Sequence, residues 1–215
     1  MKRFKYSIFD LDGTLLDSMS AWRNLGRDYL LSKDINPPEN LNKILASMSM
    51  AESAEYFKQA FNFNISSKVI IAEVNELITY KYRNDFVLKP FVKEYLQKLK
   101  DENVKMSIAT ATSLKLAKMA LERNDIIDYF QFVLSCDEIG VGKNKPDIFF
   151  MAANKLGGNP ESIAVYEDAD FALITAKEAG FFTIGVYDES FKDKREDIES
   201  ISNIYIESFK ELLYN

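Results

Sequence analysis

Two aspartates at the end of an apolar segment are the residues of this chain best placed to do chemistry. The segment Tyr6–Phe9 predicts a β-strand, and the sequence DLDGT (residues 10–14) follows it directly. Gly13 permits a sharp turn that can bring the Asp12 side chain beside Asp10. Because two like charges at that range repel, we expect a cation between these carboxylates, and an all-oxygen ligand set favours Mg²⁺.

Further polar residues, with hydroxyl, carboxylate and ammonium groups, follow later apolar segments or lie between them. The predicted strand over residues 104–109 ends at Thr110, and the predicted strand over residues 163–166 ends at the pair Glu167-Asp168. Between them, the loop GKNKPD (residues 142–147) carries two lysines. A carboxylate nucleophile, acidic metal ligands, a hydroxyl and an ammonium together suit phosphoryl transfer, in which positioning and charge stabilisation dominate.

The composition excludes several other kinds of chemistry. The 215 residues include no histidine, which removes Ser-His-Asp catalysis and histidine-ligated zinc, and the single cysteine, Cys136, excludes an intrachain disulfide. A net charge of −6 argues against nucleic-acid binding. The longest apolar runs fall far short of the roughly 20 residues of a membrane helix, and no apolar stretch follows the basic N-terminus, so we expect a cytoplasmic protein.

Alternation of strand and helix patterns places these groups in an α/β fold. After residues 18–84, which predict about four helices and no strand, the patterns alternate; helices are predicted at 91–100, 113–123, 147–156 and 171–179, and strands at 104–109, 132–135, 163–166, 182–186 and 203–206. This order predicts a Rossmann-like, doubly wound parallel sheet with an inserted helical bundle. We expect a core of residues 1–17 with 85–215 and a cap of residues 18–84. In such sheets, ligands bind at the carboxyl ends of the strands.

The ordered set of motifs resembles that of the haloacid dehalogenase (HAD) superfamily phosphatases with a small helical (C1) cap, the β-phosphoglucomutase-like subgroup. DLDGT matches the first motif, Thr110 the second, Lys143 the third, and Glu167-Asp168 the fourth. The resemblance extends over essentially the whole chain, and four motifs in order are far more specific than any one alone.

This resemblance implies a role for each residue. Asp10 would be the nucleophile that forms an aspartyl-phosphate, and Asp12 the general acid and then the general base. Mg²⁺ would be held by Asp10, the Asp12 backbone carbonyl and Asp168, with Glu167 supporting it through water. Thr110 and the following Ala111 would contact the phosphoryl group, and Lys143 would offset its negative charge.

Some of these assignments have alternatives. Thr110 could instead cap a helix, and Lys145 competes with Lys143, although alignment on the Pro146-Asp147 pair favours Lys143. Asp147 suits a helix start better than a metal ligand, and Asp170 ranks below Asp168 as a ligand for the same reason.

The resemblance implies a Mg²⁺-dependent phosphomonoester hydrolase acting on a small phosphorylated metabolite. A phosphosugar mutase is the nearest alternative; such mutases usually carry a histidine where this chain has Trp22, and valine where it has Thr14. A non-catalytic phosphoacceptor or binding module is the alternative from another class.

The inserted helices are also expected to supply contacts to the substrate. The segment Ala46–Met50 is the expected contact turn, with Ser47 and Met48 as candidates, together with Trp22. We expect a monomer, with a dimer as the alternative.

Overall fold

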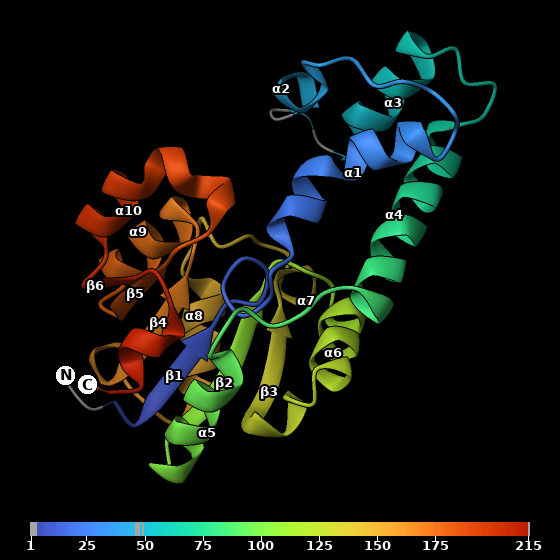
Figure 1. Cartoon of the computed structure of the whole chain (residues 1–215). Helices are drawn as coiled ribbons and strands as arrows, with labels where there is room; N and C mark the ends of the chain where they lie inside the picture. The colour runs from blue at the N-terminus through green and yellow to red at the C-terminus, as the bar shows by residue number, and fades with distance from the viewer. Residues whose placement is uncertain (1–3, 46–47, 49, 215) are drawn as a thin grey trace. The chain divides into compact units, whose positions relative to one another are not determined.

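The computed structural model describes residues 4–45, 48 and 50–214, and it divides the chain into two compact units (Figure 1). One unit combines Met1–Met19 with Phe86–Asn215, and the other is the continuous segment Ser20–Asp85. The chain therefore leaves the first unit after the first strand and returns to it before the second. We refer to these as the sheet unit and the helical unit.

The described residues of the sheet unit form a six-stranded parallel sheet with the order β3-β2-β1-β4-β5-β6. The strands are β1 (Tyr6–Phe9), β2 (Lys105–Thr110), β3 (Phe130–Ser135), β4 (Ile163–Glu167), β5 (Phe182–Val186) and β6 (Ile204–Ile206). Strand β1 lies between β2 and β4, so the carboxyl ends of these three strands are adjacent at one edge of the sheet.

Helices connect the strands and cover the sheet on both faces (Figure 1). The α-helices of this unit are α5 (Val92–Asp101), α6 (Leu114–Arg123), α7 (Cys136–Ile139), α8 (Asp147–Leu156), α9 (Asp170–Glu178) and α10 (Arg195–Ile201). Short 3₁₀ helices are η1 (Ile127–Tyr129), η2 (Pro160–Ser162), η3 (Glu189–Lys194) and η4 (Phe209–Leu212). Strands are added outward from β1 in both directions, so crossovers of the usual right hand place helices on both faces.

The alternation of side chains along β1 creates a separate core on each face. Ile8, on one face, packs in a cluster with α8 and α9 that includes Ile148 and Ala172. Phe9, on the other face, stacks on Tyr166 with ring centroids 4.2 Å apart. Because both faces are covered, most strand residues are apolar, as expected for a parallel sheet.

The helical unit contains most of α1 (Met19–Leu31) and all of α2 (Leu41–Leu45), α3 (Met50–Ala60) and α4 (Ser67–Asn84). Helix α4 buries Ile70, Val74 and Ile78, which recur at helical spacing. Within this unit, the Tyr29 hydroxyl donates to Glu73 Oε2 over 2.8 Å, so a polar contact supplements the apolar packing.

The segment by which the chain leaves the sheet unit is hydrogen-bonded to the segment by which it returns. Asp17 N donates to Val87 O over 3.0 Å, and Lys89 N donates to Leu15 O over 2.8 Å. These backbone bonds, with the bridge between Leu16 and Leu88, fix the turn that follows β1. The residues of the DLDGT motif are therefore held by the return segment as well as by the sheet.

The predicted fold class, a doubly wound parallel sheet, is confirmed, and the structure corrects some details. Strand β4 includes Glu167, one residue beyond the predicted end. Helix α7 was not predicted, because four residues are too few to show helical periodicity.

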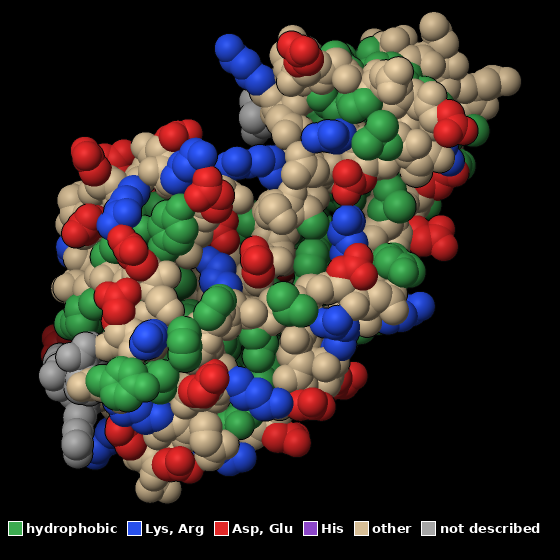
Figure 2. Space-filling model, in the orientation of Figure 1, with side chains coloured by type: hydrophobic (Ala, Val, Ile, Leu, Met, Phe, Trp, Pro, Cys, Tyr) green, Lys and Arg blue, Asp and Glu red, His purple; other side chains and the backbone are tan. Residues whose placement is uncertain are grey.

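The surface in Figure 2 carries side chains of both charge signs, interspersed among hydrophobic ones. Mixed charge of this kind is typical of a solvated surface. Within the described residues, none of the helices combines the length and apolar character that crossing a membrane requires.

The central position of β1 leads to a prediction about stability. Ile8→Ala removes a fully buried side chain from the cluster under α8 and α9, so we expect the free energy of unfolding to fall by about 2–5 kcal/mol. Urea unfolding followed by circular dichroism measures this change. The control is Ile174→Ala on the exposed side of α9, for which we expect about 1 kcal/mol or less. Equal losses would contradict the assignment of Ile8 to the core.

Candidate active site

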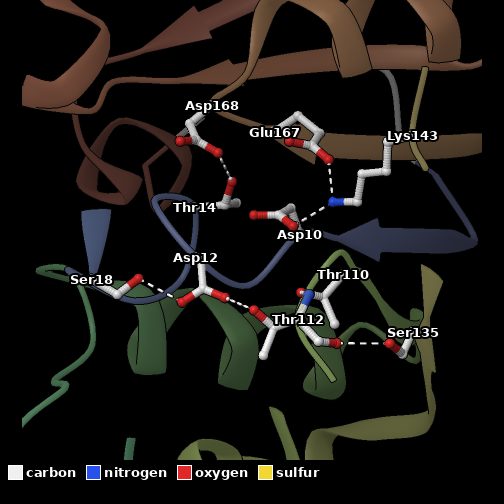
Figure 3. A network of polar contacts seen from close by, with 10 residues as sticks. All are labelled: Asp10, Asp12, Thr14, Ser18, Thr110, Thr112, Ser135, Lys143, Glu167 and Asp168. Carbon is white, nitrogen blue, oxygen red and sulfur yellow. Dashed lines mark hydrogen bonds and ion pairs between the residues drawn. The ribbon is translucent and has the colours of Figure 1, made fainter. Parts of the chain in front are cut away.

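A group of charged and hydroxyl side chains meets at the carboxyl ends of β2, β1 and β4 (Figure 3). Asp10 directly follows β1, Thr110 is the last residue of β2, and Glu167 is the last residue of β4, with Asp168 next to it. All four are buried. Each strand therefore delivers its polar residue at the point where the backbone leaves the sheet.

Lys143 reaches this edge from the loop between α7 and α8. Its ammonium points between two carboxylates and forms ion pairs with Asp10 Oδ1 and Glu167 Oε1 (Figure 3). The Lys143 side chain is only 4% exposed, whereas Lys145 is exposed. The structure thus brings Lys143, and not Lys145, together with the predicted nucleophile.

Burial and mutual charge perturb every ionisable group of this cluster. Burial raises the pKa of Glu167 from its ordinary 4.5 to about 8, against the opposing effect of Lys143. Burial likewise raises the pKa of Asp10, which Lys143 lowers in part, and it raises the pKa of Asp168 further above the ordinary range. Burial alone would lower the pKa of Lys143, but Asp10 and Glu167 more than reverse this effect and raise it.

The carboxylates of Asp10, Glu167 and Asp168 can share a cation. One oxygen from each lies within 4.8 Å of the other two, and Asp168 Oδ2 is buried without a hydrogen-bond partner among the described residues. Three carboxylates and the one ammonium of Lys143 leave an excess of two negative charges when all are ionised (3 − 1 = 2). Oxygen ligands and this excess fit a hard divalent cation such as Mg²⁺.

The Asp12 carboxylate does not belong to that group of three, and two hydroxyl groups hold it instead; a cation shared with the Asp10 side chain stays a prediction. Asp12 Oδ1 accepts a hydrogen bond from Ser18 Oγ and Oδ2 accepts one from Thr112 Oγ1, each over 2.7 Å. The turn at Gly13 therefore directs Asp12 toward these hydroxyls (Figure 3). Its backbone carbonyl as a metal ligand stays a prediction.

Thr110 and its neighbours form a short loop that β3 supports. Thr110 Oγ1 accepts a hydrogen bond from Thr112 N over 3.0 Å, and Ser135 Oγ donates to Thr112 O over 2.8 Å. Ala111, between the two threonines, is exposed. A phosphoryl group could approach this loop at Ala111 without displacing a buried side chain.

Three residues in this network were missed as site residues by sequence reasoning: Ser18, Thr112 and Ser135. The signal that could have found Thr112 is its position two residues beyond Thr110. Ser18 and Ser135 carried no comparable signal, because serine is common in connecting segments.

The other predicted residues lie outside this cluster. Trp22 belongs to the helical unit, where its Nε1 donates to Tyr82 Oη over 3.2 Å. Met48 is half-buried in the same unit, and Ser47 is not among the described residues. Asp170 begins α9 and pairs with Lys194 over 2.7 Å, and Asp147 begins α8.

Comparisons with known proteins agree on one family. A family model described as haloacid dehalogenase-like hydrolase matches residues 7–186. The β-phosphoglucomutase of Bacillus subtilis is 31% identical over 195 residues, which are 85% of this chain and 83% of that protein. A phosphorylated carbohydrates phosphatase of Thermotoga maritima is 26% identical over 197 residues, 90% of this chain and 89% of that one.

A solved structure extends the agreement to the fold. The crystal structure of a candidate β-phosphoglucomutase from Thermotoga maritima has a TM-score of 0.85 at 25% sequence identity. The match covers 97% of this chain and 96% of that chain.

The raised pKa values of the buried carboxyls predict how pH and metal affect stability. Between pH 4.5 and about 8, the folded metal-free protein retains protons that the unfolded chain has released, so its stability is highest at the low end and is lost as pH rises. We expect the midpoint temperature of thermal unfolding, measured in EDTA, to decrease as the pH is raised from about 5 to about 8. Saturating Mg²⁺ should remove most of this fall, because the cation replaces the protons.

Two variants separate the cluster from other carboxyls. Asp168→Asn should flatten the pH dependence in EDTA, whereas Asp147→Asn, at an exposed position, should leave it unchanged. A midpoint that is constant or rises over this pH range in the metal-free wild type would contradict the prediction.

Proposed function

Since the chain belongs to the haloacid dehalogenase-like hydrolases and is a phosphatase of the HAD type, we propose that it hydrolyses phosphate monoesters of small carbohydrates through an aspartyl-phosphate on Asp10. The observation that carries the proposal is the Lys143 ammonium buried between Asp10 and Glu167, next to Asp168. This arrangement keeps a buried carboxylate available for attack on phosphorus.

Asp10 is the proposed nucleophile. One of its oxygens bonds to phosphorus as the ester P–O bond breaks, and the electron pair of that bond leaves with the sugar oxygen. Attack by water on the phosphoaspartate then returns the carboxylate and releases inorganic phosphate. A covalent intermediate divides one difficult displacement into two easier ones.

Asp12 is the proposed proton carrier for both steps of the reaction. As an acid it gives its proton to the leaving sugar oxygen, and as a base it takes a proton from the attacking water. The hydroxyls of Ser18 and Thr112 fix the orientation of its carboxylate in this structure. A group held by two side chains can return to the same position after each proton transfer.

Charge stabilisation is assigned to the remaining groups. Lys143 offsets the negative charge that gathers on Asp10 and the phosphoryl oxygens, and Glu167 holds Lys143 in place. Thr110 Oγ1 and the exposed backbone at Ala111 provide the phosphoryl contact. Asp10, Asp168 and Glu167 would hold Mg²⁺, which supplies additional positive charge for the phosphoryl oxygens when bound.

The carbohydrate preference rests on relatives that are named for phosphorylated sugars. The same relatives make a phosphosugar mutase the second candidate. Against it stand Trp22, at the place where such mutases usually carry a histidine, and the hydrogen bond that occupies its indole N–H. We propose that residues 18–84 act as the cap that selects the leaving group.

A product analysis tests hydrolysis against the mutase alternative. Purified protein with Mg²⁺ is incubated with p-nitrophenyl phosphate and with hexose 1- and 6-phosphates, and both inorganic phosphate and isomerised sugar phosphate are measured. We expect phosphate release, which Asp10→Asn should reduce by roughly 10³-fold or more because the amide is no nucleophile. Isomerised sugar phosphate as the main product would favour the mutase, and no turnover of any ester would contradict both enzymes.

The lysine assignment gives a separate prediction. Lys143→Met should lower kcat for p-nitrophenyl phosphate by about 100-fold or more, because it leaves Asp10 and Glu167 buried without their cation. The matched control, Lys145→Met in the same loop, should stay within about two-fold of the wild type, since its side chain is exposed. Circular dichroism checks that both variants fold. Similar losses in both variants would contradict the role of Lys143.

A further inference from the structure

The two oxygens of the Asp168 carboxylate have different surroundings. Oδ1 accepts a hydrogen bond from Thr14 Oγ1 over 3.1 Å (Figure 3). Oδ2 is buried and has no hydrogen-bond partner among the described residues. Because a buried carboxylate oxygen without a partner is costly, this difference requires an explanation.

Gly13 leaves room for the second oxygen. Its backbone has φ of +86°, and a Cβ atom built at this position would lie 2.1 Å from Asp168 Oδ2. Any other residue would therefore displace the Asp168 side chain, in addition to the cost of the left-handed backbone. Gly13, three residues after the proposed nucleophile Asp10, thus leaves the space that Asp168 Oδ2 occupies.

Thr14 is held in place independently of Asp168. It is fully buried, and the turn that contains it is closed by Gly13 N donating to Leu16 O over 3.0 Å. Leu15 and Leu16, also fully buried, anchor the following residues in the core. A hydroxyl on such a fixed backbone can orient a flexible partner, rather than follow it.

From these contacts we propose that Thr14 is a positioning residue for cation binding, and that Asp168 binds the cation through Oδ2 alone while Oδ1 remains on the Thr14 hydroxyl. The inference deepens the proposed function, on which it rests for the identity of the metal. Thr14 does not touch the cation; it fixes the rotation of a carboxylate that has one oxygen within 4.8 Å of carboxylate oxygens of Asp10 and Glu167.

Loss of the hydroxyl should weaken metal binding specifically. Without a donor to Oδ1, the Asp168 carboxylate can rotate, and part of the binding free energy is then spent on restoring its orientation. Hydrogen-bonding partners of metal ligands typically contribute 10–100-fold to affinity. Valine keeps the shape of threonine but removes the hydroxyl, whereas serine keeps the hydroxyl.

The experiment uses Mn²⁺ as a paramagnetic probe and measures its binding by electron paramagnetic resonance, without substrate. We expect Thr14→Val to raise the Mn²⁺ dissociation constant about 10-fold or more, and Thr14→Ser to stay within about two-fold of the wild type. The matched control is Thr183→Val on β5, which also removes a fully buried hydroxyl, one that bonds Asn203 Oδ1 over 3.1 Å. Its Mn²⁺ affinity should not change.

Other outcomes overturn the inference. The inference is wrong if Thr14→Val binds Mn²⁺ as tightly as the wild type does. It is also wrong if Thr14→Ser binds as weakly as Thr14→Val, or if the wild type does not bind Mn²⁺. If Thr14→Val does not fold, a crystal structure of the Mn²⁺-bound wild type decides: coordination by Oδ2 with Oδ1 on Thr14 supports the inference, and coordination by Oδ1 overturns it. Since neither measurement uses a substrate, failure to find phosphatase activity would contradict the proposed function and leave this result intact.

Discussion

One buried ammonium between two buried carboxylates is the interaction on which the rest of this site depends. Lys143 pairs with Asp10 and Glu167, and all three side chains are almost completely removed from solvent. A buried carboxylate without such a partner would take up a proton, and a protonated Asp10 would not be a nucleophile. The excess negative charge that remains after this pairing makes the same position attractive to a divalent cation.

The parallel sheet brings these groups together with little help from the connecting loops. Strand β1 lies between β2 and β4, although the three strands are far apart in the sequence. The residues at their carboxyl ends therefore become neighbours at one edge of the sheet. Thr110, Asp10 and Glu167 are positioned by strand ends, whose backbones are fixed by hydrogen bonds on both sides. Loops then add what the strands cannot supply: Lys143 from the segment before α8, and the turn that carries Asp12 and Thr14.

Hydroxyl groups have a larger part in this site than the charged residues suggest. Ser18 and Thr112 hold Asp12, Thr14 holds Asp168, and Ser135 holds the backbone next to Thr110. Asp12 and Asp168 are thus each oriented by neighbours that take no part in the reaction. Because a hydroxyl fixes direction without adding charge, it can orient a carboxylate and leave the balance between Lys143 and the acidic groups unchanged.

The sequence by itself determined the fold class, most of the strands and the composition of the site. Apolar strands that end in Asp10, Thr110 and Glu167-Asp168 are local features, and the order of strands and helices fixes a parallel sheet whose active edge can be inferred. Only the tertiary structure decided which way Asp12 points, that Thr14 contacts Asp168, and that Lys143 is buried while Lys145 is exposed. These are contacts between side chains 100 or more residues apart, or rotations within one turn. Local sequence patterns contain no information about either, because both follow from the packing of the complete fold.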